Sequence, residues 1–435
     1  MGYTPKNRSA IPEENMRQKI RWAIACLLAC SLVAALSFPA EAKAPAKAKT
    51  PAARKAAPKA KKSAPQKKAA PAPLPPISSI CVEAETGMLL HEENADMQRP
   101  PASMVKLMIM LLVQEGLESG KWKLDQTIVV SQHAEKMGGS QVYVKMNDQW
   151  PLETLMKAIA VASANDASMA VAEGLWGSAE KCLEAMNARA KELGMNNTIY
   201  NSVHGLPPGP GQQADVTTAR DMSVLGRECV KHPAIFNWTA LKEFQLRPEE
   251  APHPSTNKLM LSMPDCDGLK TGFIRLAGFC ITATAKRNDV RVIAVVMGDD
   301  SKYERFRIAQ QLMEEGLKAV KRVKVVAKGD PVGEPVPVEN CMTPNVRLIA
   351  DSDLSVVVKA DDAPKVELVA DRPAKLTPPV AAGIAVGEFR AQLAGNVLGK
   401  GGLINPLELK PKTLWQRLFG AATSEQPLAS GVPAR

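Results

Sequence analysis

Three short strings in this chain carry residue types able to perform acyl transfer. They read S-x-x-K at Ser103–Lys106, S-x-N at Ser163–Asn165 and K-T-G at Lys270–Gly272. One S-x-x-K string alone is a weak signal, since many proteins of this length contain one by chance. The three strings together, in this order, are typical of serine enzymes that pass through a covalent acyl intermediate. The sequence therefore predicts nucleophilic catalysis by a serine.

The first string pairs a hydroxyl with an amine. A serine hydroxyl is a poor nucleophile until a base removes its proton. Ser103 and Lys106 are three residues apart, so on a helix their side chains share one face. Lys106 can act as the base only if its pKa is lowered, by the apolar residues around it and by a second cation such as Lys270. Ser103 would also open the helix, where backbone N–H groups favour a developing oxyanion.

The other two strings supply polar groups for a substrate. The Ser163 hydroxyl suits proton relay, and the Asn165 amide suits a substrate backbone group. On a strand, Lys270 and Gly272 share one side, so Lys270 can bind a carboxylate while Gly272 leaves the strand edge open for a peptide. Gly268 and Gly272 further predict a close approach of another segment to this strand.

A catalytic triad built on histidine is the competing scheme. The sequence has five histidines: His91, His133, His204, His232 and His253. No G-x-S-x-G string surrounds any serine, and that string is the usual setting of such a nucleophile. His204 is therefore predicted to organise its loop, and the lysine-based scheme is preferred.

The net charge of +10 comes from one segment. Residues 43–76 consist almost entirely of Ala, Lys and Pro, with ten basic residues and no acidic residue. Such a composition cannot bury a core and predicts a disordered tether. The rest of the chain is near neutral, so the charge indicates no nucleic-acid partner; the tether would suit an anionic membrane or wall polymer.

Residues 1–42 are predicted to be a signal peptide. Arg17, Lys19 and Arg21 precede an apolar run that ends before Ala40-Glu41-Ala42, an acceptable cleavage site. An uncleaved anchor or a lipid on Cys30 remain alternatives. We therefore expect an exported protein. Six cysteines follow the signal without metal-ligand spacing, so we expect mostly buried free thiols, no metal and no cofactor.

The rest of the chain predicts an α+β protein. Residues 77–323 alternate strands and helices and form the predicted catalytic domain. Its strands are expected at Ser79–Glu83, Met88–His91, Cys266–Phe273, Gly278–Thr284 and Val290–Met297. Residues 324–409 hold short alternating runs bounded by Pro and Asp, typical of a small all-β domain. The runs are Val346–Ile349, Leu354–Lys359, Lys365–Val369 and Glu388–Leu393. Residues 410–435 are predicted to be a short amphipathic segment, suited to a membrane interface, followed by a disordered tail.

The surroundings of the strings resemble one family. Arg99–Met108, Ser163–Ala167 and Asp267–Gly272 are similar, over about residues 77–410, to low-molecular-mass penicillin-binding proteins that are serine-type D-Ala-D-Ala carboxypeptidases. Phe273, where His or Tyr is more usual, and an enlarged loop at Pro207–Gly211 depart from the family pattern.

The resemblance implies a fold and a set of roles. The fold is a β-lactamase/transpeptidase-like domain, an antiparallel sheet flanked by helices, followed by a small all-β C-terminal domain. The backbone N–H groups of Ser103 and Phe273 would form the oxyanion hole. The implied catalytic residues are Ser103, Lys106 and Ser163. The implied substrate-binding residues are Asn165, Lys270, Thr271, Gly272, Phe273 and Arg305, of which Arg305 is the weaker candidate for holding a carboxylate.

The implied activity is removal of the terminal D-Ala from peptidoglycan stem peptides, with acylation by β-lactams, in the periplasm at the outer face of the inner membrane. A D,D-endopeptidase acting on cross-links would use the same residues. A β-lactamase would need E-x-x-L-N, and Glu192–Asn196 has Met where Leu is required. A non-catalytic wall-binding scaffold would have no need of Lys106 or Lys270.

The tether gives a first prediction. Deletion of residues 43–76 is expected to leave the hydrolysis rate of a soluble D-Ala-D-Ala peptide unchanged, because a disordered spacer contributes nothing to the active site. A large loss of rate on this substrate would contradict the interpretation of the segment as a spacer.

Overall fold

The computed structural model describes residues 76–419. The predicted signal peptide, nearly all of the predicted tether and the predicted tail after residue 419 lie outside the described residues. Within residues 76–419, no helix is both long and apolar enough to cross a membrane.

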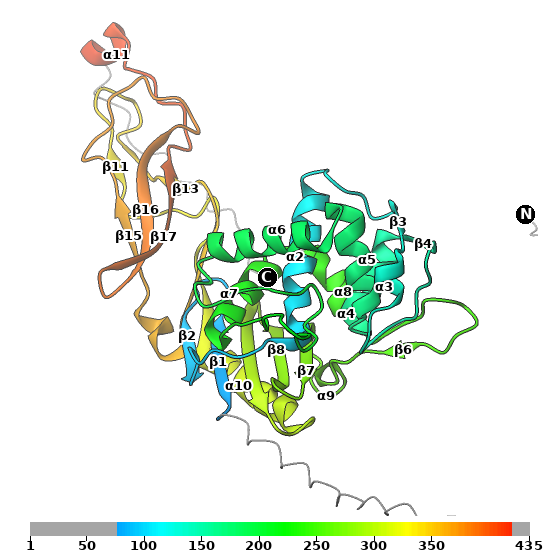
Figure 1. Ribbon diagram of the computed structural model, residues 1–435. Helices are drawn as coiled ribbons and strands as arrows, with labels where there is room; N and C mark the ends of the chain where they lie inside the picture. The colour runs from blue at the N-terminus through cyan, green and yellow to red at the C-terminus, as the bar shows by residue number, and fades with distance from the viewer. Residues whose placement is uncertain (1–75, 420–435) are drawn as a thin grey trace, which may run out of the picture. The chain divides into compact units, whose positions relative to one another are not determined.

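The catalytic domain is built on a five-stranded antiparallel sheet with the strand order β2-β1-β9-β8-β7 (Figure 1). The strands are β1 (Ser78–Glu83), β2 (Leu89–Glu93), β7 (Cys266–Ile274), β8 (Gly278–Arg287) and β9 (Val290–Asp299). These agree with the strands that alternation in the sequence predicts. Strand β7, which carries the K-T-G string, lies at the edge of this sheet and pairs only with β8 within it.

Helices cover both faces of the sheet, and strand β9 shows why. Its run of apolar residues is buried on both sides. Val292, Ala294 and Val296 pack in one core with α10 (Glu304–Ala319), and alternate residues such as Ile293 and Val295 pack in the other core. A period of two on a strand places neighbours on opposite faces, so a continuous apolar strand needs a layer on each side.

The second core is the larger one and is mostly helical. Its helices are α2 (Lys106–Glu118), α3 (Gln132–Glu135), α4 (Leu152–Val161), α5 (Asn165–Trp176), α6 (Ala179–Glu192), α7 (Ala219–Val230) and α8 (Phe236–Thr239). Helix α2 is buried around most of its circumference, and a 3₁₀ turn, η1 (Ala102–Val105), leads into it. Helix α9 (Leu259–Ser262) and two short strand pairs, β3 (Thr127–Val129) with β4 (Gln149–Pro151) and β5 (Glu243–Phe244) with β6 (His253–Pro254), complete the domain.

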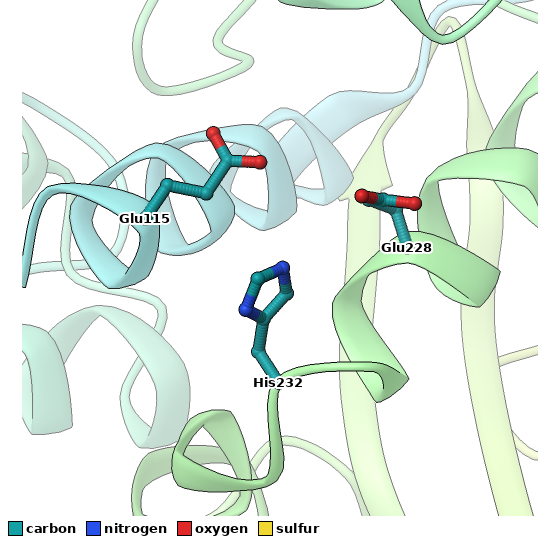
Figure 2. A group of neighbouring side chains, drawn as sticks. All are labelled: Glu115, Glu228 and His232. Carbon is teal, nitrogen blue, oxygen red and sulfur yellow. The ribbon is translucent and has the colours of Figure 1, made fainter. Parts of the chain in front are cut away.

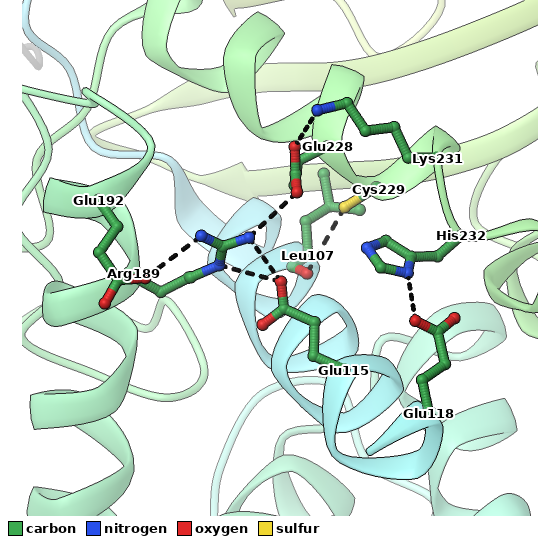
Figure 3. A network of polar contacts seen from close by, with 9 residues as sticks. All are labelled: Leu107, Glu115, Glu118, Arg189, Glu192, Glu228, Cys229, Lys231 and His232. Atoms are coloured by element: carbon green, nitrogen blue, oxygen red, sulfur yellow. Dashed lines mark hydrogen bonds and ion pairs between the residues drawn. The ribbon is translucent and has the colours of Figure 1, made fainter.

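A network of charged side chains joins α2 to α6 and α7 (Figure 3). The Arg189 guanidinium on α6 lies 2.7 Å from Glu115 on α2 and 3.0 Å from Glu228 on α7. All three side chains are about three-quarters buried or more, so the contacts are only weakly screened by water. The network fixes the far half of the helix that follows the 3₁₀ turn carrying Ser103.

The glycines of strand β7 mark close approaches, as predicted. A Cβ on Gly272 would lie 2.6 Å from the Pro101 carbonyl oxygen, and one on Gly268 would lie 2.8 Å from Thr239 Oγ1. The Cβ position of Gly272 therefore faces the segment that leads into Ser103. Packing inside the protein therefore requires this glycine.

A small all-β module follows, as predicted. Its strands are β10 (Val320–Val326), β11 (Val336–Pro337), β12 (Asn345–Val346), β13 (Ile349–Ala350), β14 (Leu354–Lys359), β15 (Glu367–Asp371), β16 (Ala385–Leu393) and β17 (Asn396–Ile404), with a 3₁₀ turn, η3 (Ala360–Lys365). The predicted boundary between residues 323 and 324 falls inside β10. After the module, α11 (Leu414–Phe419) presents exposed Leu414, Trp415 and Leu418 side chains.

Six cysteines lie among the described residues, and all six are buried free thiols, as the sequence analysis expected for most of them. They are Cys81, Cys182, Cys229, Cys266, Cys280 and Cys341.

The contact at Gly272 gives a stability prediction. Gly272→Ala is expected to lower the free energy of unfolding by about 1–3 kcal/mol, because the added methyl group overpacks against a backbone carbonyl. Thermal unfolding followed by circular dichroism measures the change. Gly138→Ala is the matched control, since its Cβ would meet no atom within 4 Å. Equal stabilities of the two variants would contradict the tight contact.

Candidate active site

The structure places the Lys106 amine against the Ser103 hydroxyl. The 3₁₀ turn brings Ser103 into position one turn before Lys106, and the distance from Nζ to Oγ is 2.9 Å. Nζ also lies 2.8 Å from Asn165 Oδ1 and 2.7 Å from the His204 carbonyl oxygen. The lysine side chain is fully buried. Three oxygen atoms from three separate segments therefore surround one amine.

This arrangement suits a neutral amine. Burial lowers the pKa of Lys106 well below its usual value, and the charge of Lys270 lowers it further, against opposing effects of Asp215 and Asp166. A neutral amine has two hydrogens and one lone pair. The carbonyl oxygens of Asn165 and His204 can only accept, so they take the two hydrogens. The lone pair is left for the Ser103 hydroxyl proton, an arrangement that would let Lys106 act as a base.

A second serine–lysine pair lies on the other side of the site. Lys270 Nζ donates to Ser163 Oγ at 2.9 Å and to the Thr271 carbonyl oxygen at 3.1 Å. Burial, and then the charge of Arg305, lowers the pKa of Lys270 to about 7. Ser163 has φ of +61°, a left-handed conformation that is uncommon for residues other than glycine. Strain of this kind is often kept where it positions a functional group.

Asn165 connects the base to a loop beside it. Its Nδ2 donates to the Gly138 carbonyl oxygen at 2.7 Å, and its backbone N–H donates to the Ser140 carbonyl oxygen at 2.8 Å. The next residue, Asp166, accepts from the backbone N–H groups of Val142 and Val144. The Asn165 amide thus positions Lys106 and anchors the loop, and a direct contact with substrate stays a prediction.

The remaining predicted residues lie on the second half of strand β7 or contact it from α10. Thr271 Oγ1 donates to Thr256 Oγ1 at 2.9 Å. Phe273 is 52% exposed and stacks on Phe279, with ring centroids 4.1 Å apart. Arg305, in contrast, is buried, and its Nη1 donates to the Gly272 and Cys280 carbonyl oxygens. The predicted role of Arg305 in binding a substrate carboxylate stays a prediction.

Sequence reasoning missed the groups that hold the base in place. The His204 carbonyl is one of them. The Asp215 carboxylate accepts from the backbone N–H groups of Asn201 and Ser202 and from the Ser202 hydroxyl, and so stabilises the loop that leads to His204. Backbone carbonyls leave no trace in residue type. The one available signal was Gly205, whose φ of +80° and close approach to Ala102 require a glycine.

His204 organises its loop, as predicted. Its Nδ1 accepts from the Leu206 N–H at 3.0 Å. Burial is the main cause that lowers the pKa of His204 to about 4. The imidazole is therefore neutral at pH 7.

One group of side chains away from this site has metal-ligating types. Glu115, Glu228 and His232 offer ligand atoms within 4.8 Å of one another, and Figure 2 shows the three facing a common space. Figure 3 shows the Arg189 guanidinium between the two carboxylates. A cation already satisfies both glutamates, so we assign no metal to this group.

Comparisons with known proteins agree with the geometry. The family described as D-alanyl-D-alanine carboxypeptidase matches residues 65–301, and the penicillin-binding protein 5 C-terminal domain matches residues 321–413. The chain is 31% identical over 327 residues to the D-alanyl-D-alanine carboxypeptidase DacF of Bacillus subtilis (strain 168), covering 74% of this chain and 83% of that protein.

Solved structures give the same picture. Penicillin-binding protein 5 of Haemophilus influenzae is similar with a TM-score of 0.59 and 25% identity, covering 77% of this chain and 97% of that one. Penicillin-binding protein D2 of Listeria monocytogenes in its ampicillin-bound form has a TM-score of 0.50 and 31% identity, over 55% of this chain and 96% of that one.

These findings confirm the predicted fold class, an antiparallel sheet flanked by helices with a small all-β domain after it. The family match covers more than half of the chain and includes all three strings. The chain belongs to the D-alanyl-D-alanine carboxypeptidase family of serine enzymes.

Proposed function

We propose that this protein removes the terminal D-Ala from peptidoglycan stem peptides ending in D-Ala-D-Ala, through an acyl-enzyme on Ser103. The observation that carries the proposal is the buried Lys106 amine, which lies 2.9 Å from the Ser103 hydroxyl and has its hydrogens directed at two carbonyl oxygens. A serine with such a base is a nucleophile at neutral pH.

Acylation follows from this geometry. Lys106 takes the Ser103 proton as Oγ attacks the carbonyl carbon of the penultimate D-Ala. The N–H groups of Ser103 and Phe273 stabilise the negative charge that develops on the carbonyl oxygen. Collapse of this intermediate breaks the peptide bond, and the proton reaches the leaving nitrogen through the Ser163 hydroxyl. Water then hydrolyses the ester with Lys106 again as base, which returns Ser103.

The terminal carboxylate of the substrate has an evident partner. Lys270 and Thr271 are neighbours on β7; the Lys270 amine donates to Ser163 Oγ, and the Thr271 hydroxyl donates to Thr256 Oγ1. A carboxylate is bound strongly by a charged donor in a site shielded from water. Because β7 lies at the sheet edge, a peptide can align beside it while Lys270 fixes its end.

The same serine would accept β-lactams. The ampicillin-bound structure of the Listeria relative supports acylation of this kind, since a β-lactam presents a reactive carbonyl beside a carboxylate. We further propose that the protein is exported, with residues 1–42 as signal peptide, and acts in the periplasm. Exposed Leu414, Trp415 and Leu418 near Arg417 on α11 support contact with the outer face of the inner membrane.

The domain limits follow the same proposal. Residues 43–76 would be a tether, residues 77–323 the catalytic domain, residues 324–409 the β domain, and residues 410–435 the amphipathic end and tail.

The nucleophile is tested by D-Ala release. The protein is expected to release D-Ala from a soluble L-Lys-D-Ala-D-Ala peptide, and Ser103→Ala is expected to abolish this, because no other group can form the ester. Fluorescent penicillin should label only the unsubstituted protein. Labelling without D-Ala release would favour D,D-endopeptidase action on cross-links, and absence of both would favour a wall-binding scaffold.

The pH profile tests the two lysines. Below the pKa of Lys106 the amine is a cation that cannot accept a proton, so kcat/KM is expected to fall on the acid side. Above the pKa of Lys270, about 7 in the free protein, loss of its charge weakens carboxylate binding and gives an alkaline limb. Lys270→Arg keeps the charge at all working pH values, so it should move the alkaline limb to higher pH. An alkaline limb that does not move would contradict this assignment.

A further inference from the structure

The side chain of Arg305 extends from α10 and contacts the backbone of strand β7. Arg305 lies in the first turn of α10 and is only 5% exposed. Its Nη1 donates to the Gly272 carbonyl oxygen at 2.9 Å and to the Cys280 carbonyl oxygen at 3.0 Å. Gly272 on β7 and Cys280 on β8 are paired in the sheet, so one guanidinium nitrogen donates to both strands at the same register position.

The Gly272 carbonyl that accepts from Arg305 belongs to the same peptide group as the Phe273 N–H. A peptide group is planar, and in the trans form its C=O and N–H point in opposite directions. The Gly272–Phe273 bond is trans. Fixing the Gly272 oxygen on one side therefore fixes the direction of the Phe273 N–H on the other side. A cation at the oxygen also draws electron density from the nitrogen, which makes the N–H a stronger donor.

Neighbouring groups hold the guanidinium rigidly. Its carbon lies 4.6 Å from the centroid of the Phe306 ring and 5.2 Å from that of the Phe279 ring. Burial lowers the pKa of Arg305 to about 10, so the side chain keeps its charge at neutral pH, and the nearby Asp299 carboxylate supports that charge. A long side chain held by two rings and two carbonyl oxygens loses its freedom once, on folding, and adds no cost of ordering during catalysis.

We propose that Arg305 is a positioning residue that orients and polarises the Phe273 N–H toward the oxyanion of the acylation step. The proposal rests on the proposed function, in which this N–H is one of two oxyanion donors. It differs from direct binding of the substrate carboxylate by Arg305, because the hydrogen bonds of Nη1 go to the backbone carbonyls of Gly272 and Cys280.

The two roles predict different kinetics. An oxyanion donor acts mainly in the transition state, so misplacing it lowers kcat. A carboxylate contact acts in the bound ground state as well, so losing it raises KM with kcat unchanged. Loss of a whole oxyanion donor costs about 10²–10³-fold in kcat, so the loss of the group that positions one is expected to cost about 10- to 100-fold.

The experiment compares three variants of the full protein with the unsubstituted protein. Arg305→Met removes the cation and keeps an apolar chain of similar length. Arg305→Lys keeps a cation with donors and serves as the folded comparison if the Met variant is unstable. Arg307→Met is the matched control, because Arg307 lies on the same helix, is 64% exposed and pairs with Glu304. Each is assayed for D-Ala release and for the infrared carbonyl stretch of its penicillin acyl-enzyme, after thermal unfolding confirms that it is folded.

We expect kcat to fall in the order unsubstituted, Arg305→Lys, Arg305→Met, with KM little changed. The acyl carbonyl stretch should move to higher wavenumber in the same order, because the ester oxygen loses hydrogen bonding. Arg307→Met should match the unsubstituted protein in both measurements.

A raised KM with unchanged kcat and an unshifted carbonyl stretch would overturn the inference and return Arg305 to carboxylate binding. The proposed function fails separately, and the inference with it, if the unsubstituted protein neither releases D-Ala nor forms an acyl-enzyme.

Discussion

The proposed chemistry of this protein depends on keeping one lysine amine uncharged beside a serine hydroxyl. Water would keep that amine protonated, so the fold removes water from it completely. The helix that carries Lys106 is surrounded by apolar side chains, and the two oxygens that share the pocket with Ser103 arrive from a helix N-terminus and a loop. Each of these segments is fixed by contacts of its own, so a large part of the domain serves to hold three oxygens around one nitrogen.

This arrangement has a cost that the rest of the fold offsets. Burying a lysine without a carboxylate partner is unfavourable, and a second buried lysine nearby adds repulsion. Ala102 and Ser163, one residue before Ser103 and two before Asn165, have left-handed backbone conformations, with φ of +49° and +61°. One apolar core on each face of the sheet, together with the Arg189 network on α2, supplies the compensating stability. Strain and buried charge are thus concentrated at the site and tolerated because its surroundings are over-determined.

Much of this could be predicted from the sequence, and the failures have a common cause. The side chains of the three strings lie together in the structure, as the sequence predicted, and alternation identified the strands of the main sheet. Residue types do not reveal which backbone carbonyls meet a side chain, so the His204 carbonyl beside Lys106 and the Gly272 carbonyl beside Arg305 were missed. Strand β17 was missed because its glycines and lysine hide the alternation, although these glycines fit against Leu354, Phe389 and Asp351.

The two lysines also explain how the base can be neutral at rest and yet strong enough in use. In the free protein, the charge on Lys270 helps to lower the pKa of Lys106, which keeps the base unprotonated. Under the proposed function, the substrate carboxylate binds at Lys270 and offsets that charge. The repulsion on a protonated Lys106 then weakens, so its proton affinity rises when Ser103 must lose its proton. A substrate with a terminal carboxylate thereby strengthens the base that activates Ser103, and a peptide lacking that group does not. Selectivity for a chain end is then built into the acid–base chemistry as well as into binding.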